Sequence, residues 1–424
     1  MSYLLIGCSA LLSWVGAASI LFFLFAAAGG ANTGGALAAF AVAGGVCSFV
    51  WRGVKPPAGP EPVFRWHWLV AAAFGLALAL AAATAWADMA AAPHGDWDAW
   101  SIWNVRARML AGGAWRNAVS PEFRNHPDYP MLTSSFIASL WALVGSNTTL
   151  IPRLTSAMFF GATPLALAAG IGLLRGRAMG WIAGVVLLAT AGFVSEAPVQ
   201  YADIPLSGFM LLAVAWLALD EPVPAGVFAS LAAWTKNEGV AFCVVFLAAG
   251  FLWRKRLALI AGAAPGLAFV AIFKLLIAAP TSGSVSPDLA RLADPSRHLQ
   301  VASAFAQGIW AMGLDWRHPA LVVIALAAVL RFRPHEGAAP AGIATMALAV
   351  IDYLVYVTTR DDAAWLLSTS LNRILVQLTP AGLFTAFLLI RPVDEVAPVE
   401  AASTPETPAA RKQGARGGRK AMQS

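Results

Sequence analysis

Two carboxylates in the sequence His94-Gly-Asp96-Trp-Asp98 come soon after an apolar segment, near the start of the hydrophilic stretch 88–130. A carboxylate in such a place can act as a general base or bind a cation. Asp98 also stands where a helix beginning near Ala99 would need an N-cap, so a capping role and a catalytic role are both open. The pattern makes Asp96 and Asp98 candidate catalytic residues.

Basic and aromatic residues follow these carboxylates and can face an anion. Arg106 and Arg108 alternate with small and apolar residues after a group of tryptophans. The stretch then closes with His126-Pro-Asp128-Tyr-Pro, which either begins the next helix or contributes to a site. The histidines and carboxylates of the stretch can together hold a divalent metal, although their spacing is not diagnostic: His94, Asp96, Asp98, His126 and Asp128.

Charged residues also stand at the ends of later apolar segments, where an ionised side chain is costly and usually has a use. Asp203 begins one such segment, and Lys236 and Glu238 lie between two others that have hardly any loop between them. Lys236 can pair with Asp203 or Glu238, or it can bind an anion. Arg373, at the entrance of the last apolar segment, can be a phosphate ligand or an anchor that snorkels to the membrane surface.

The composition that surrounds these residues excludes a soluble protein. Of the 424 residues, 59% are hydrophobic and 12% are charged, whereas soluble domains carry about 25% charged residues. The apolar residues form continuous blocks of about 20 residues, enough to cross a bilayer as helices and unlike the alternating strands of a β-barrel. We therefore predict an all-α polytopic membrane protein. The net charge of +6 does not indicate nucleic acid, because the basic end of the C-terminal tail, 411–424, holds five basic residues and no acidic one.

The apolar blocks predict about twelve transmembrane helices, and basic clusters between them orient the chain. With these clusters in the cytoplasm, both termini are cytoplasmic, and the large loops 88–151 and 280–317 lie outside. The predicted spans are 3–27, 34–51, 66–87, 152–174, 178–195, 202–219, 223–235, 239–253, 257–279, 318–330, 340–358 and 373–391.

Two further apolar stretches, 131–146 and 299–314, would break the parity of the crossings. We predict that they are interfacial helices within the two outer loops. Residues 1–391 then form one transmembrane domain, and the Pro-, Ala- and Glu-rich segment 392–424, with its basic end, forms a disordered cytoplasmic tail.

Three of the charged motifs, taken in order and by side, resemble the GT-C superfamily of polyprenyl-phosphate-sugar-dependent glycosyltransferases. They are Asp98 shortly before a Met-Leu pair in the first outer loop, Asp203 in the Asp-x-Pro-Leu start of a span, and Lys236 in a Thr-Lys pair at a span end. The lipid A aminoarabinose transferase, the protein O-mannosyltransferases and the rhizobial lipopolysaccharide transferases are the most similar members. The resemblance covers roughly residues 66–280.

The chain departs from the family pattern in three places. Ala99 follows the loop aspartate where the family has a glutamate, and Asp96 lies upstream instead. His126-Pro-Asp128 stands where the family has a Lys-Pro motif, and Asn237-Glu238 separates the Thr-Lys pair from its glycine.

The resemblance implies inverting transfer of a sugar from a polyprenyl-phosphate donor to a hydroxyl of a lipid, glycan or protein, on the outer face of the cell (inner) membrane. It implies Asp98 as the base, with Asp203 and Asp96 in the same catalytic group. We expect the substrate and its phosphate to meet Lys236, Arg106, Arg108, His126, Asp128, Glu238 and Arg373. No cofactor is certain and a divalent metal stays open; membrane lipids are expected partners and nucleic acid is not.

Two other function classes stay open. A secondary transporter or lipid flippase would have the same spans and would also use charged residues within them, such as Lys274 and Asp352. A non-catalytic relative is the other alternative, because the glutamate that the family has after the loop aspartate is missing at Ala99.

Overall fold

A computed structural model describes residues 1–54, 57–60, 64, 66–250, 256–280, 287–313 and 318–395. Within these ranges the protein is helical throughout and contains no strand, so the predicted all-α class is confirmed. One isolated bridge joins Phe332 to Ile390. Most of the predicted tail at 392–424 lies outside the described residues, as do parts of the loop 280–317.

The helices of the first half are α1 (Ser2–Ala27), α2 (Thr33–Gly53), α3 (His67–Ala91), the π-helix η1 (Ala99–Trp103), α4 (Asn104–Ala111), η2 (Trp115–Val119), α5 (Leu132–Val144), α6 (Leu150–Arg175), α7 (Arg177–Leu188), α8 (Ala191–Glu196) and α9 (Asp203–Ala218). Those of the second half are α10 (Pro222–Thr235), α11 (Asn237–Gly250), α12 (Arg256–Ile272), η3 (Phe273–Ile277), η4 (Leu289–Ala293), α13 (Pro295–Ala311), α14 (Pro319–Leu330), α15 (Ala338–Thr358), α16 (Ala363–Leu389) and η6 (Val393–Glu395).

Seven described helices are long and apolar enough to cross a membrane: α1, α2, α3, α6, α12 with η3, α15 and α16. Five other predicted spans are helices as well, but they are shorter: α7, α9, α10, α11 and α14. The stretches predicted as interfacial are the helices α5 and α13. The helices are therefore those expected from the apolar blocks, and their lengths separate seven candidate spans from the rest.

Helix α9 lies at the centre of the bundle. Every residue from Asp203 to Ala218 is buried, and α6, α10 and α16 pack around it. With 16 residues, α9 is shorter than the roughly 20 residues that a helix needs to cross a bilayer, and the neighbouring helices that cover it on all sides hold it in place. By contrast, α2 and α3 expose large apolar side chains such as Phe49, Leu76 and Leu80, as expected for surfaces that face lipid.

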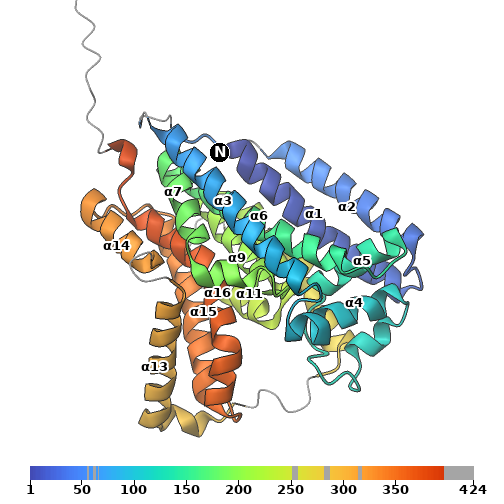
Figure 1. Cartoon of the computed structure of the whole chain (residues 1–424). Coiled ribbons are helices and arrows are strands. Elements are labelled where there is room, and N and C mark those ends of the chain that lie inside the picture. The colour runs from blue at the N-terminus through green and yellow to red at the C-terminus, as the bar shows by residue number, and fades with distance from the viewer. Residues whose placement is uncertain are drawn as a thin grey trace, which may run out of the picture.

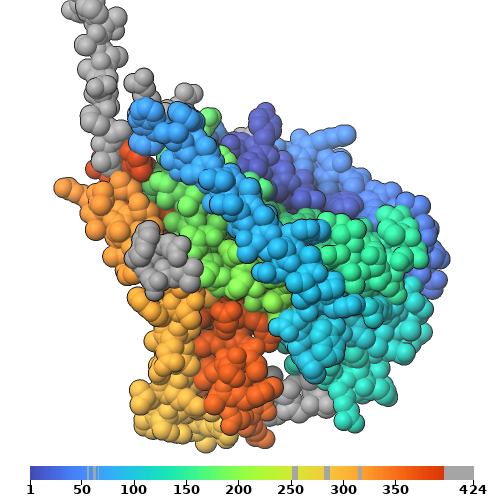
Figure 2. Space-filling model, in the orientation of Figure 1, coloured from blue at the N-terminus to red at the C-terminus, as the bar shows by residue number. Residues whose placement is uncertain are grey.

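The N-terminus and the last described residues lie at one end of the molecule (Figure 1). Contacts also tie the C-terminal part of the chain to the segment before α3 and to the end of α6, because the Phe64 amide donates to Asp394 and Arg175 donates to the carbonyl of Leu388. The first loop with α4, and α13 beside α15 and α16, lie toward the other end (Figure 1). In Figure 2 a hollow separates the first loop, in cyan, from the lower part of α16, in red-orange.

Candidate functional site

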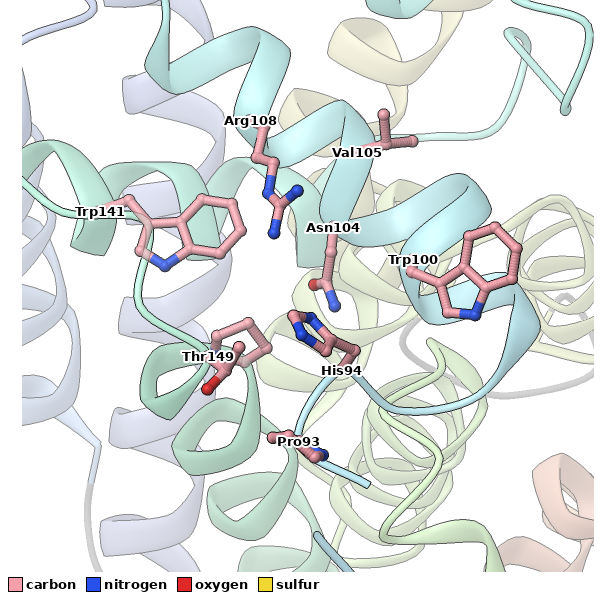
Figure 3. A pocket seen from close by; sticks show the side chains of 9 residues that line it. Pro93, His94, Trp100, Asn104, Val105, Arg108, Trp141 and Thr149 are labelled. Carbon is pink, nitrogen blue, oxygen red and sulfur yellow. The ribbon is translucent and has the colours of Figure 1, made fainter. Parts of the chain in front are cut away.

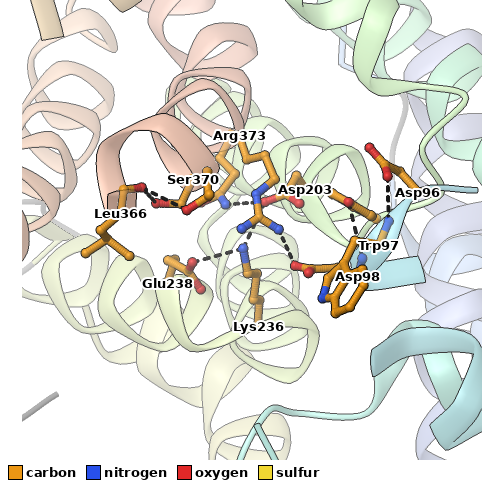
Figure 4. A network of polar contacts seen from close by, with 12 residues as sticks. Asp96, Trp97, Asp98, Asp203, Lys236, Glu238, Leu366, Ser370 and Arg373 are labelled. Carbon is orange, nitrogen blue, oxygen red and sulfur yellow. Dashed lines mark hydrogen bonds and ion pairs between the residues drawn. The ribbon is translucent and has the colours of Figure 1, made fainter. Parts of the chain in front are cut away.

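Asp98 pairs with Arg373, which lies 275 residues away in the sequence. Both side chains keep 19% of their surface exposed, so the pair is desolvated but reachable. The Arg373 guanidinium also lies over the ring of Tyr201, 5.1 Å from its centroid. The Tyr201 hydroxyl in turn accepts a hydrogen bond of 3.2 Å from the Asp98 backbone amide. These contacts hold the carboxylate and the guanidinium face to face (Figure 4).

A second, deeper ion pair joins Asp203 to Lys236. The ammonium of Lys236 lies 2.9 Å from Asp203 Oδ1 and 3.0 Å from Glu238 Oε1, so both predicted pairings are present together. The Gln377 amide donates to the same oxygen of Asp203. Burial alone would lower the pKa of Lys236, but the carboxylates of Asp203 and Glu238 raise it well above its usual value. Lys236 therefore stays charged although it is buried.

Local structure explains why these side chains meet. Asp203 is the first residue of α9, and Lys236 occupies an extended break between α10 and α11. Arg373 and Gln377 are one helical turn apart on α16, so both face the same side. Arg373 reaches Asp98 and Gln377 reaches Asp203. Helix α16 thus links the two ion pairs into one centre, which we call the Asp98–Lys236 centre.

The Asp98–Lys236 centre contains several buried polar atoms that have no hydrogen-bond partner among the described residues. They are Asp203 Oδ2, Glu238 Oε2, Gln377 Oε1 and Arg373 Nε. Most buried polar atoms in folded proteins are satisfied, so four such atoms in one cluster point to a place where a ligand or water completes the bonding.

A third group of polar side chains adjoins this centre. Lys274 Nζ lies 3.0 Å from Asp128 Oδ2 and 2.7 Å from Asn237 Oδ1, and the Asn237 amide donates to Asp128 at 2.7 Å. Because Asn237 lies between Lys236 and Glu238 in the sequence, Asp128 comes to the edge of the centre. Lys274, on the π-helix η3, completes this group; the sequence marked Asp128 and Lys274 as separate charged residues and did not indicate that they meet.

His126 lies near the carboxylates as part of an aromatic stack. Its ring is parallel to that of Tyr129, with centroids 4.3 Å apart, and Tyr129 stacks on Trp103 at 5.6 Å. Burial lowers the pKa of His126 and the charge of Asp128 opposes this only in part, so the imidazole is neutral at neutral pH. Burial disfavours the charged form of Tyr129 as well, which for a phenol raises the pKa.

Arg106 has a structural position and does not reach the Asp98–Lys236 centre. Its side chain is fully buried, and it donates to the carbonyl oxygens of Ala118, Pro127 and Tyr129. Burial lowers its pKa to about 9. Arg106 therefore holds the first loop together, and its predicted contact with phosphate has no support in this geometry.

Asp96 and Arg108 also lie apart from the centre. Asp96 is exposed, and its carboxylate accepts from the neighbouring Trp97 amide at 2.7 Å. Arg108 lies over the ring of Trp141, 6.0 Å from its centroid. Asp98, by contrast, makes no side-chain capping bond to the helix that follows it, so the capping role that the sequence left open is not observed.

Sequence reasoning missed several residues of the site. Gln377, Tyr201 and Glu196 are buried or half-buried in or near the centre. Burial raises the pKa of Tyr201 to about 12. A signal for Gln377 existed in the sequence, because it is a polar residue within an apolar segment, four positions after Arg373.

No group of three or more His, Cys, Asp or Glu side chains that could hold a metal ion occurs among the described residues. The residues considered for a divalent metal have different partners: Asp98 forms an ion pair with Arg373, and Asp128 forms one with Lys274.

Comparison with known proteins gave no match: no family model, no curated protein and no solved structure is significantly similar to this chain.

Proposed function

We propose that the protein is an integral-membrane glycosyltransferase that moves a sugar from a polyprenyl-phosphate donor to an acceptor hydroxyl. One observation carries the proposal: the three motif residues Asp98, Asp203 and Lys236 come from separate segments and meet in one centre with Arg373. The residues in this arrangement include a base, a buried charged lysine and an arginine at the border of an apolar helical bundle, as the chemistry requires.

In the proposed reaction Asp98 takes the proton of the acceptor hydroxyl while the hydroxyl oxygen attacks the anomeric carbon. The bond between that carbon and the donor phosphate breaks with inversion, and polyprenyl phosphate leaves. Lys236 and Arg373 balance the charge that builds on the departing phosphate oxygen. Asp203, which is bound by Lys236 and Gln377, keeps the ammonium in position.

The ion pair between Asp98 and Arg373 suggests an order of events. While Arg373 is bound to Asp98, the guanidinium occupies Oδ2 of the carboxylate, so this oxygen is not available to an acceptor hydroxyl. A donor phosphate is a competing anion for the same guanidinium. Donor binding would therefore free Asp98 to accept a proton at the moment when the acceptor can react.

The wider arrangement belongs to the same proposal. Both termini would be cytoplasmic, with about twelve crossings, and the Asp98–Lys236 centre would open to the outer face of the cell membrane. Support comes from the distribution of charge, because the centre lies with the first loop, away from the end at which Arg175, Arg333 and the N-terminus gather.

The sharpest test compares two aspartates that lie two positions apart. Asp98→Asn should lower sugar transfer by about 10²–10⁴-fold, as expected for loss of a general base. Asp96→Asn is the matched control, because Asp96 is exposed and lies outside the centre, and it should keep wild-type activity. Transfer or hydrolysis is measured with purified protein and a panel of undecaprenyl-phosphate hexoses, pentoses and uronic acids.

Lys236→Ala, as a single variant, should also abolish transfer. Thermal unfolding should show that each variant is folded. If folded Asp98→Asn protein turns over a donor as fast as the Asp96→Asn protein, Asp98 is not the base. If no member of the panel is consumed by wild-type protein that carries out ion-coupled transport of a solute, the enzyme proposal fails and the transporter class is favoured.

A further inference from the structure

A small pocket lies on another face of the first loop, apart from the Asp98–Lys236 centre. It has a volume of about 90 Å³ and is lined by Trp100, Asn104 and Arg108, together with His94, Trp141 and Thr149. Figure 3 shows the side chains of these six residues arranged around the opening. Ligand sites for whole molecules usually exceed about 300 Å³, so this pocket has room for one group of a larger ligand.

The spacing in the sequence shows how the pocket is separated from the centre. Trp100, Asn104 and Arg108 are spaced four residues apart along η1 and α4, so they lie on one face of the helix. Ile102 and Trp103 are buried on another face against Ala202 and Tyr201. One helix therefore presents Asp98 at its start to the centre and a separate polar stripe to the pocket.

The electrostatics of the pocket favour an anion. Arg108 contributes a guanidinium, His94 an imidazole and Thr149 a hydroxyl at the N-terminus of the 26-residue helix α6. Helix N-termini carry a partial positive charge that favours anions. Of the residues described around the pocket, none carries a carboxylate. The pocket thus has a positive charge that no acidic side chain of its lining balances.

Asn104 adds a second requirement on the ligand. The residue is 6% exposed, and its Oδ1 is buried without a hydrogen-bond partner among the described residues. Such an oxygen needs a donor, which a carboxylate or a phosphate dianion does not supply but a neighbouring hydroxyl does. Trp100, which is 48% exposed, and Trp141 offer flat aromatic walls of the kind that pack against the C–H faces of a ring.

We infer that this pocket takes up the anionic group of an acidic sugar, a hydroxylated ring that carries a carboxylate or a phosphate group, while the ring itself lies at the mouth of the pocket. The anionic group meets Arg108 and the N-terminus of α6, an adjacent hydroxyl donates to Asn104, and the ring lies against Trp100. The inference concerns binding alone and does not depend on the proposed transfer reaction.

The test is a titration of purified full-length protein with glucuronate, glucose 6-phosphate and glucose, followed by calorimetry or ligand-observed NMR. We expect saturable binding of at least one of the two acids and much weaker binding of glucose. Comparison of the two acids distinguishes a carboxylate from a phosphate as the recognised group. Arg108→Gln should weaken binding of the acid by about tenfold or more, because it removes a charge-assisted contact.

Arg116→Gln is the matched control, since Arg116 is exposed in the same loop and lies 4.8 Å from the ring of Trp115 without lining the pocket. It should bind like wild type. Asn104→Leu should also weaken binding, and the exposed Arg108 supplies the decisive variant if Asn104→Leu does not fold. Equal binding of glucose and both acids, absence of binding by all three, or full binding by Arg108→Gln would each overturn the inference.

Discussion

At the scale of single residues, Asp96 and Asp98 show how neighbours in one motif receive different environments. The Asp96 carboxylate is exposed and bonds to the next amide in the chain, whereas the Asp98 carboxylate is turned toward Arg373. The difference arises because the chain enters the π-helix η1 directly after Asp98. Asp98 has a cationic partner in Arg373, and for this reason we propose Asp98, and not Asp96, as the base.

Glu196 gives a prediction about pH. Burial, followed by the field of Asp203, raises the pKa of its carboxyl well above the ordinary 4.5. Between the ordinary pKa, which applies to the unfolded chain, and the raised pKa of the folded protein, the folded protein holds a proton that the unfolded chain has released. The free energy of unfolding therefore falls as the pH rises through this window. The contribution is fully present below pH 4.5. Glu196→Gln should remove this part of the pH dependence.

The measurement for Glu196 is the thermal unfolding midpoint in detergent as the pH is raised from about 4 to 8, the window in which a buried carboxyl changes charge. The gap between the Glu196→Gln protein and wild type should widen in favour of the variant. Glu336→Gln, at an exposed residue of the opposite end, should follow the wild-type profile. Parallel curves for Glu196→Gln and wild type would show that Glu196 titrates alike in both states.

At the scale of elements, the first loop is organised by one buried arginine. Arg106 joins three points of the loop through the carbonyl oxygens of Ala118, Pro127 and Tyr129. These bonds place the segment that holds His126 and Asp128 beside α4. An arginine in a loop next to candidate acids resembles a ligand for phosphate in sequence, and burial is what assigns it to the scaffold.

Arg106→Ala should therefore destabilise the protein by about 3 kcal/mol, because it leaves buried carbonyl oxygens without a donor. Thermal unfolding and the rate of proteolysis within residues 112–130 measure the effect. Arg116→Ala is the control, since Arg116 is exposed and its guanidinium lies over the ring of Trp115. A folded Arg106→Ala protein of wild-type stability that has lost transfer would instead favour a direct role in binding.

At the scale of the whole molecule, the buried helix α9 decides where the site lies. It begins with Asp203 and is enclosed by α6, α10 and α16, so the start of the most buried helix brings the elements that carry Lys236 and Arg373 together. The charges gather around this point, while the opposite end carries the N-terminus and the buried Arg175. This polarity underlies the orientation that we propose.

The orientation is tested with single cysteines at the two ends. Arg116 in the first loop and Glu336 between α14 and α15 are both exposed. With the three native cysteines replaced by serine or alanine, Arg116→Cys should react with a membrane-impermeant maleimide in intact cells or spheroplasts, and Glu336→Cys only after the membrane is opened. Labelling of both positions from one side would contradict the proposed topology.

Much of the architecture follows from the sequence alone, because each apolar block must satisfy its backbone polar groups internally and therefore forms a helix. Within the described residues, each of the twelve predicted spans and each of the two additional stretches corresponds to a helix. Asp98, Asp203 and Lys236 were likewise identified from sequence, since charge at the end of an apolar segment is costly enough to be noticed.

Tertiary structure alone decided which of the candidate residues lie together. Gln377 and Arg373 belong to the centre because α16 packs against α9, and Arg106 belongs to the scaffold because the loop closes over it. The pocket around Asn104 depends on α5 and α6 as well as on its own helix. Such contacts join residues that are distant in the chain. The local sequence shows that a charged residue stands in an apolar segment, but it does not show which residue pairs with it.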